Sequence, residues 1–185
     1  MTKPNPTPLL QLRDLRVDVA EHTVLQSITL DVPAGALVVL MGANGSGKST
    51  LAMALAGHPS YRVAGGQATL DGQDLLAMNV QERARAGLFL SFQSPPDIPG
   101  VKNNLFIRTA LNAVHEARGE APLDAFDFLG QARAAAQQLG LPEALLSRPV
   151  NEGFSGGERK RNELLQLAFH IADQRMERLC LAGRR

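Results

Sequence analysis

The sequence is poor in cysteine and in aromatic residues. Among 185 residues it has one cysteine, Cys180, one tyrosine and no tryptophan. A single cysteine cannot form a disulfide within the chain, and no group of cysteines and histidines has the spacing of a zinc or iron–sulfur site. We therefore expect this chain not to ligate a metal cluster.

The sequence also lacks an excess of charge and long apolar runs. Nineteen basic and 18 acidic residues give a net charge of +1, too little to hold a nucleic acid by neutralising its phosphates. No run of about 18 uncharged apolar residues and no secretory signal are present. We expect a cytoplasmic protein with no nucleic-acid partner and no segment inserted directly in a membrane.

An α/β pattern fills the first half of the chain. Apolar residues alternate from Leu10 to about Val32, which predicts antiparallel strands, and the continuous apolar run 36–41 predicts a strand buried on both faces. The turn dipeptide Asp71-Gly72 predicts a second hairpin. The other expected elements are a helix over 49–56, the hairpin over 65–75 and a buried strand over 87–93.

The composition becomes helical after residue 93. Three prolines in residues 94–100 interrupt the strand pattern. Two helices are predicted beyond them, the second starting near Asp124 and ending at Gly140. Residues 94–150 are thus expected to form a helical lobe inserted into an α/β core. The apolar faces expected are Phe106, Ala110, Ala113, Val114 and Ala117 in the first helix, and Phe128, Ala132, Ala135, Ala136 and Leu139 in the second.

A phosphate-binding loop is predicted between strand 36–41 and the helix that follows it. The stretch GANGSGKS fills the template G-x-x-x-x-G-K-[ST] between a buried strand and a helix start. Its backbone N–H groups and the helix dipole favour a polyphosphate, with Lys48 at the β- and γ-phosphates, Ser49 on Mg²⁺ and Thr50 toward the α-phosphate. A glycine-rich turn that only tightens the corner is the alternative. The predicted ATP-binding residues are Gly42, Ala43, Asn44, Gly45, Ser46, Gly47, Lys48, Ser49 and Thr50.

A second motif opens a helix near the end of the chain. Ser155, Gly156 and Gly157 precede Glu158, so a small hydroxyl residue and two glycines start a helix with an acidic first turn. This pattern fits a second anion-binding helix start. It equally fits an ordinary helix cap.

These motifs together resemble those of the ATP-binding cassette (ABC) ATPases. GANGSGKST corresponds to Walker A, Gln93 to the Q-loop residue and FSGGE to the signature motif. The sequence most closely resembles the SufC-type ATPases of iron–sulfur cluster (SUF) assembly, from about Leu10 to Ala168. The resemblance implies that Lys48 and Gln93 act in catalysis, with Gln93 also near Mg²⁺.

The resemblance also implies partners. ATPases of this type associate with SufB and SufD scaffold proteins, here through the helical lobe, and two heads form a head-to-tail dimer around ATP. Ser155, Gly156, Gly157 and Glu158 would then contact the nucleotide of the other head. The aromatic residue that usually stacks on adenine is Val19 in this chain, so base recognition is expected to rest on apolar packing, with His22 exposed.

The groups that hydrolysis requires are not found in the sequence. Phosphoryl transfer in this family needs an Asp for Mg²⁺, a Glu that orients water and a later His, and neither Asp173 nor Glu177 follows an apolar strand. Leu179-Cys180-Leu181 resembles the beginning of the Walker B strand, but Ala-Gly-Arg-Arg follows it. We expect a tail altered or truncated after about residue 168, through a frameshift, a gene-model error or a natural truncation.

The sequence therefore predicts an α/β P-loop NTPase of the ABC type, with an antiparallel β subdomain, an inserted helical lobe and a core sheet incomplete at its C-terminus. Its predicted function is ATP binding, with Mg²⁺, that drives conformational change in a SUF scaffold. The alternative is a non-catalytic nucleotide- or scaffold-binding fragment; FSGGERKR argues against a small-molecule kinase. The expected divisions are a flexible leader (1–8), the nucleotide-binding core with its β subdomain (9–93), the helical lobe (94–150), the signature helix (151–168) and an atypical tail (169–185).

Overall fold

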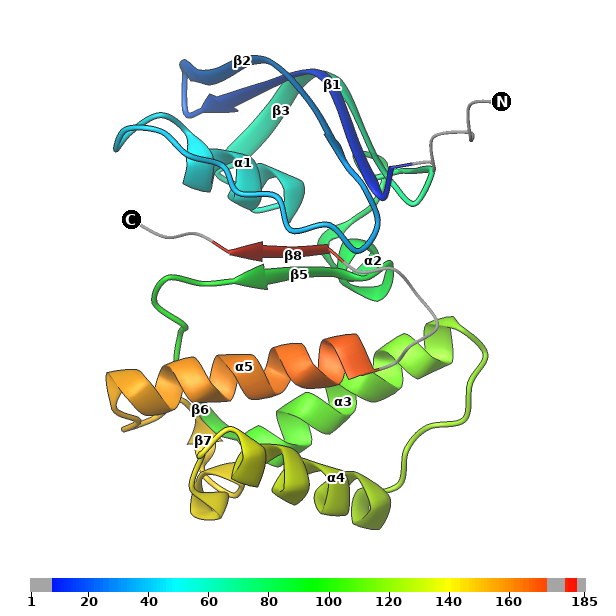
Figure 1. The fold of residues 1–185 in the computed structure, drawn as a ribbon, viewed down its shortest axis with the longest axis vertical. Coiled ribbons are helices and arrows are strands. Elements are labelled where there is room, and N and C mark those ends of the chain that lie inside the picture. Colours follow the sequence, from blue (N-terminus) through cyan, green and yellow to red (C-terminus); the bar gives the residue numbers. More distant parts are fainter. Residues whose placement is uncertain (1–7, 173–178, 183–185) are drawn as a thin grey trace. The chain divides into compact units, whose positions relative to one another are not determined.

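A computed structural model describes residues 8–172 and 179–182 (Figure 1). The chain divides into two compact units, one formed by residues 1–91 with 175–185 and the other by residues 92–174. The expected leader lies almost wholly outside the described residues, as do Asp173 and Glu177. In the part of the chain that is described, no helix is both long and apolar enough to cross a membrane.

The first unit contains a four-stranded antiparallel sheet in the order β2-β1-β3-β4. Its strands are β1 (Leu10–Val19), β2 (His22–Val32), β3 (Tyr61–Leu70) and β4 (Gln73–Asp74). The two expected hairpins are confirmed: Leu10 pairs with Val32, and Leu70 pairs with Gln73 across Asp71-Gly72. Both turn residues have positive φ, which Asp and Gly tolerate.

Helix α1 (Lys48–Leu55) packs with this sheet around one apolar core. Leu51, Ala54 and Leu55 are its buried residues, at helical spacing. The helix ends at Gly57 (φ 81°), which takes the left-handed conformation that closes many helices. Arg83 of α2 (Val80–Arg85) donates to the last carbonyl groups of α1, those of Ala54 (3.0 Å) and Leu55 (2.8 Å).

The strand expected over residues 36–41 is wrong for this structure. The segment has no regular secondary structure, and Leu37, Val39 and Met41 are 92%, 68% and 90% exposed. A strand needs a neighbour for its backbone N–H and C=O groups, and no described strand pairs with this segment. Apolar composition alone therefore did not produce a buried strand.

A separate pair of parallel strands also belongs to the first unit. β5 (Leu88–Ser91) pairs with β8 (Leu179–Ala182), with Leu88 opposite Leu179 and Ser91 opposite Ala182. The strand expected over 87–93 is confirmed in shorter form, and only Leu88 is fully buried. The segment that resembled the start of a Walker B strand thus forms a strand.

The second unit is mainly helical. Its elements are β6 (Ile98–Lys102), α3 (Asn103–Ala117), α4 (Ala125–Gln138), the 3₁₀ turn η1 (Glu143–Leu146), β7 (Pro149–Val150) and α5 (Gly156–Ala172). Asp124 caps α4 by accepting from the backbone of Phe126 and Asp127, and Gly140 follows its end. The core gathers side chains from α3, α4, η1 and α5.

Two expectations for this unit differ from the structure. The prolines of residues 94–100 were expected to interrupt the strand pattern, yet Ile98–Lys102 forms β6 and pairs with β7. The face of α4 is confirmed. The face of α3 is confirmed only in part: Phe106 packs on the core, but Ala110 and Ala117 are exposed, and the core also takes Ile107 and Leu111. Large apolar side chains at i and i+4 bury more surface than alanines, and they decided the orientation.

Candidate nucleotide-binding loop and signature helix

The phosphate-binding loop joins α1 at a position, Gly47, that only glycine fits. Gly47 is the N-cap of α1, with φ 86°, and a Cβ built there would overlap Cδ2 of Leu25. Gly45 also has positive φ (82°), but a Cβ there would meet nothing within 4 Å. The loop from Gly42 to Ser46 is exposed, so its backbone is accessible to a ligand.

Lys48 folds back over this loop. Its ammonium donates to the carbonyl oxygens of Gly42 (2.8 Å) and Ala43 (2.7 Å) and to the hydroxyl of Ser46 (3.2 Å). The lysine is thereby held over the same loop whose backbone would surround a phosphate. Ser49 is exposed and Thr50 is half-buried in the first turn of α1. The chemistry of this donor set fits a polyphosphate with its Mg²⁺.

The signature motif forms a reciprocal cap at the start of α5. The backbone N–H of Ser155 donates to Glu158 (2.7 Å), and the N–H of Glu158 donates to the Ser155 hydroxyl (3.3 Å). The bond from the Ser155 backbone is the main cause of a lowered pKa for the Glu158 carboxyl. The helix-cap interpretation of Ser155 and Glu158 is therefore confirmed, while their role in nucleotide contact stays a prediction.

The segment around Gln93 is fastened to α5. The residue before it, Phe92, donates its N–H to Glu163 (2.6 Å) and accepts from Lys160 (3.0 Å) at its carbonyl. Asp97 at the other end forms an ion pair with Arg159 (2.7 Å). The Gln93 side chain is exposed. Gln93 lies in the second unit with the signature motif, and the phosphate-binding loop lies in the first.

Sequence reasoning missed three buried asparagines in the second unit. Asn103, Asn151 and Asn162 are at most 2% exposed, and each donates to the next acceptor in a row that ends at the carbonyl of Pro96. Their signal in the sequence was weak, because asparagine is usually a surface or turn residue. Only Asn151, with φ 60° just before the signature motif, is a typical turn asparagine.

With this geometry established, the comparison with known families is decisive. The family model described as ABC transporter matches residues 25–173, a stretch that contains the phosphate-binding loop, Gln93 and the signature motif. This chain belongs to the ABC transporter family. The expected ABC ATPase family is thereby confirmed.

Curated relatives resemble the chain over most of its length. "Probable ATP-dependent transporter SufC" of Escherichia coli (strain K12) is 49% identical over 160 residues, which are 86% of this chain and 64% of that protein. "ABC transporter I family member 6, chloroplastic" of Arabidopsis thaliana is 48% identical over 87% of this chain and 48% of its own. The chain spans less than two thirds of the length of these relatives.

Solved ABC structures share the fold. A dimeric bacterial ABC transporter cassette, MJ0796, aligns with a TM-score of 0.68 at 18% identity, over 89% of this chain and 69% of that one. The same cassette in a post-hydrolysis state bound to ADP and Pi aligns with a TM-score of 0.69, also at 18% identity and over the same shares of both chains. The expected P-loop ABC fold is confirmed.

The β1–β2 hairpin carries Val19 and His22, the two residues considered for contact with adenine. Val19 pairs with His22 at the end of the β1–β2 hairpin; Val19 is half-buried, and His22 is exposed as expected. Beside them Asp18 accepts from Thr23 (2.8 Å) and Arg62 (2.7 Å). The hydrogen bond from Thr23 is the largest cause that lowers the pKa of Asp18. Adenine recognition by this hairpin stays a prediction.

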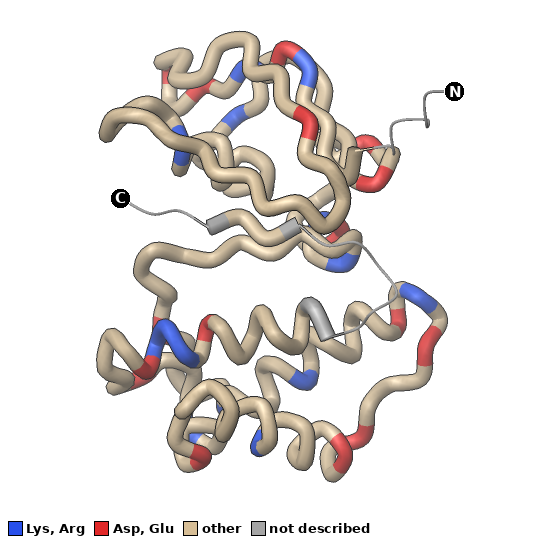
Figure 2. Tube along the Cα trace, in the orientation of Figure 1, with Lys and Arg blue, Asp and Glu red and all other residues tan. Residues whose placement is uncertain are grey.

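Charges along the cassette are of both signs. Figure 2 shows Lys and Arg intermixed with Asp and Glu along the trace of each unit. Among the described residues, no three His, Cys, Asp or Glu side chains gather in a group that could hold a metal ion.

Proposed function

We propose that this chain is the ATP-binding subunit of a SUF iron–sulfur cluster assembly machinery, whose ATP binding drives conformational change in a scaffold. The observation that carries the proposal is the phosphate-binding loop with Lys48 held over it and Gly47 at a position that only glycine fits. The 49% identity to the protein named SufC favours this system over other ABC ATPases. Membership of that system would also place the chain in the cytoplasm.

The nucleotide would be held mainly by backbone N–H groups of residues 42–47. Lys48 would exchange its present carbonyl and hydroxyl partners for the β- and γ-phosphate oxygens, since an ionic acceptor makes the stronger hydrogen bond. The Ser49 hydroxyl, with Gln93, would help to hold Mg²⁺. When bound, Mg²⁺ neutralises charge on the phosphates.

The signature motif would act on the nucleotide of a second ATPase head. The exposed start of α5 presents Ser155, Gly156 and Gly157, where free backbone N–H groups and the helix dipole attract an anion. A head-to-tail dimer would bring this helix start to a γ-phosphate held by the partner head. The arrangement accounts for two anion-binding helix starts in one chain.

The helical lobe would bind the SufB- or SufD-type scaffold. Phe126 at the start of α4 is 87% exposed and Leu105 on α3 is half exposed. Large exposed apolar side chains are costly in water and typical of interaction surfaces. The relative named SufC and the exposed lobe together support this partner.

A second candidate is a nucleotide- and scaffold-binding module without hydrolysis. It is favoured by β8, because Leu179–Ala182 forms the strand parallel to β5 but Gly183-Arg184-Arg185 follows it in the sequence. No carboxylate stands there to hold Mg²⁺ or to orient water. Loss of such groups lowers phosphoryl-transfer rates by orders of magnitude.

Nucleotide binding tests the proposed function. Calorimetric titration with MgATP should show measurable binding by the 185-residue chain, and Lys48→Ala should lower the affinity at least about tenfold, because a charge-assisted contact to phosphate is lost. Lys102→Ala, which removes an exposed lysine of the second unit, is the control and should bind like the parent. Equal affinities for Lys48→Ala and the parent would rule out this loop as the site.

Phosphate release separates the two candidates. The chain mixed with purified SufB- and SufD-type scaffold should release inorganic phosphate from MgATP at a rate that Lys48→Ala abolishes if it hydrolyses ATP. Binding in the calorimeter without release above the Lys48→Ala background supports the non-catalytic module.

A further inference from the structure

One row of side chains crosses the end of the antiparallel sheet in the first unit, where β1, β2 and β3 lie side by side (Figure 1). Val19 of β1 lies opposite His22 of β2 on one side and opposite Tyr61 of β3 on the other. Residues directly opposite in antiparallel strands point to the same face of the sheet. These three residues therefore form one row, the tip row, in which His22 is exposed and the other two are half-buried.

The tip row lies on the face of the sheet that packs on α1. Tyr61 and Val63 are two residues apart on β3, so they share a face, and both pack against the apolar core that includes α1. The residue between them, Arg62, points to the other face, where it donates to Asp18 (2.7 Å). The register of β1 and β3 is regular over these residues. The tip row thus continues the core face of the sheet.

The next row on the same face reaches the phosphate-binding loop. It consists of Leu25, Val17 and Val63, which lie opposite one another on β2, β1 and β3. Leu25 lies so close to Gly47 of the loop that a Cβ on this glycine would overlap its side chain. Strand residues advance about 3.3 Å each, so the tip row lies about 7 Å further along the strands. It is therefore close enough to contact the base of a nucleotide whose phosphates the loop holds.

Tyr61 gives the tip row an aromatic ring in a fixed orientation. Its ring meets that of His58 in a T-shaped arrangement, with centroids 5.2 Å apart and an interplanar angle of 79°. His58 is itself held, because its Nδ1 accepts from the backbone N–H of Ser60 (3.2 Å). Tyr61 is only half-buried, so part of its ring stays accessible. An aromatic ring that is held in place and accessible can stack on a base.

We propose that Tyr61 is a base-binding residue, whose ring stacks on the base of bound ATP while Val19 packs beside it. The inference rests on the proposed function, in which the loop over residues 42–47 holds the phosphates. Valine stands at position 19, where ABC ATPases usually have the stacking aromatic residue. The ring comes instead from the neighbouring strand, directly opposite Val19. Apolar packing by the hairpin is thereby joined by an aromatic contact from β3.

Intrinsic fluorescence tests the contact in the unaltered chain. Tyr61 is the only tyrosine and there is no tryptophan, so tyrosine emission reports on this ring alone. Saturating MgATP should quench the emission, whereas saturating magnesium tripolyphosphate, which has the phosphates without a base, should leave it unchanged. Free N-acetyltyrosinamide at the same MgATP concentrations corrects for light absorbed by adenine. Emission that saturating MgATP leaves unchanged, or that both ligands quench equally, overturns the inference.

Substitutions separate a base contact from a purely structural role. Tyr61→Leu removes the ring but keeps apolar bulk. In calorimetry it should weaken MgATP binding about fivefold or more, the effect of one lost stack on a base, and leave the affinity for magnesium tripolyphosphate unchanged. Tyr61→Phe keeps the ring and should bind MgATP like the parent. Ile28→Ala is the control: it trims another half-buried side chain on the same core and should leave the ratio of the two affinities unchanged.

The outcomes distinguish this inference from the proposed function. If Tyr61→Leu weakens binding of tripolyphosphate as much as that of MgATP, the ring is only structural and the inference is overturned, while binding that depends on Lys48 still supports the proposed function. If Tyr61→Leu does not fold, the fluorescence of the parent chain decides. A parent chain that binds neither MgATP nor tripolyphosphate overturns both.

Discussion

Gly45 and Gly47 lie in the same loop, but the structure tolerates a larger side chain differently at the two positions. Both have φ above 80°, where a Cβ strains the backbone. Only at Gly47 would the added atom also overlap a neighbouring side chain, that of the buried Leu25. The sequence template treats the two glycines alike, whereas the packing of the hairpin against the loop distinguishes them.

This difference predicts unequal costs of alanine substitution. Gly45→Ala should lower the free energy of unfolding by about 1 kcal/mol, from backbone strain alone. Gly47→Ala should cost about 1–3 kcal/mol more, because Leu25 or the loop must shift. Urea unfolding of both variants, followed by the change in far-UV circular dichroism, measures this difference. Equal midpoints for the two variants would contradict the packing of Leu25 on the loop.

Glu158 gives a residue-scale prediction in pH. Its pKa is lowered in the folded chain, mainly by the Ser155 backbone, so folding favours the ionised form. The stabilisation is complete above the unfolded pKa, about 4.5, and is lost as the pH falls through the lower folded value. Glu158→Gln should therefore be less stable than the parent at pH 7, and the difference should shrink on acidification below the ordinary carboxyl range.

A substitution at Glu152, six residues before Glu158, is the control for this experiment. Glu152→Gln neutralises an exposed carboxylate in the turn before α5 and should leave the stability at pH 7 unchanged. A Glu158→Gln deficit that persists unchanged into acid would show that the cap does not depend on the ionised carboxylate.

At the scale of elements, segment 36–41 is expected to promote aggregation of the chain. Its odd-numbered residues are the most exposed, as in an extended segment with one side to solvent, and no strand within 8–172 or 179–182 pairs with it. An apolar extended segment with free backbone groups is a template for association between chains. Val39 lies at its centre.

Val39→Lys should therefore slow aggregation. The side chain is 68% exposed, so its loss should change the free energy of unfolding by less than about 0.5 kcal/mol. The added charge should oppose pairing of two such segments. Static light scattering at 37 °C would follow aggregation, with Thr29→Lys, at an exposed site on paired strand β2, as the control. An aggregation rate equal to that of the control would exclude this segment as the cause.

Elements with local signals could be predicted from the sequence, and elements that depend on distant partners could not. The Asp71-Gly72 turn, the Asp124 cap and Gly140 act within a few residues, and each marks a boundary that the structure has. Strand β6 depends on pairing with β7 about 50 residues later, and Ile107 depends on which helices cover α3. No window of sequence contains those partners.

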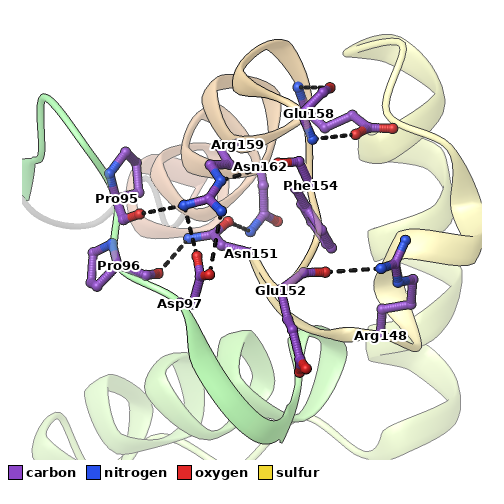
Figure 3. Close-up of polar contacts among 11 residues, drawn as sticks. Pro95, Pro96, Asp97, Arg148, Asn151, Glu152, Phe154, Glu158, Arg159 and Asn162 are labelled. Carbon is purple, nitrogen blue, oxygen red and sulfur yellow. Dashed lines mark hydrogen bonds and ion pairs between the residues drawn. The ribbon is translucent and has the colours of Figure 1, made fainter.

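At the scale of the whole molecule, the predictable part of the site is its motifs and the unpredictable part is their connection. The template located the loop and its Lys48, and S-G-G-E allowed a capped helix start, which the structure has. The contacts that hold the segment around Gln93 join residues 92–97 to residues 151–163, which composition and periodicity do not relate (Figure 3). The unit to which a residue belongs is decided by its contacts and not by its neighbours in the sequence: Phe92 directly follows β5 but belongs to the second unit.

Two chains are needed to test the role of the signature motif. If Ser155 acts on a nucleotide held by a partner head, Ser155→Arg should leave MgATP binding by the single chain unchanged and abolish ATP-dependent association with an intact SufC-type head, because a bulky cation would occupy the start of α5. Ser155→Ala is the matched control: it removes the 3.3 Å hydrogen bond of the cap without adding bulk and should weaken association only in part. Sedimentation velocity with ATP and with ADP measures the dimer. If Ser155→Arg lowered binding by the single chain as much as Lys48→Ala does, the signature motif would belong to the chain's own nucleotide site, and the head-to-tail arrangement would be wrong.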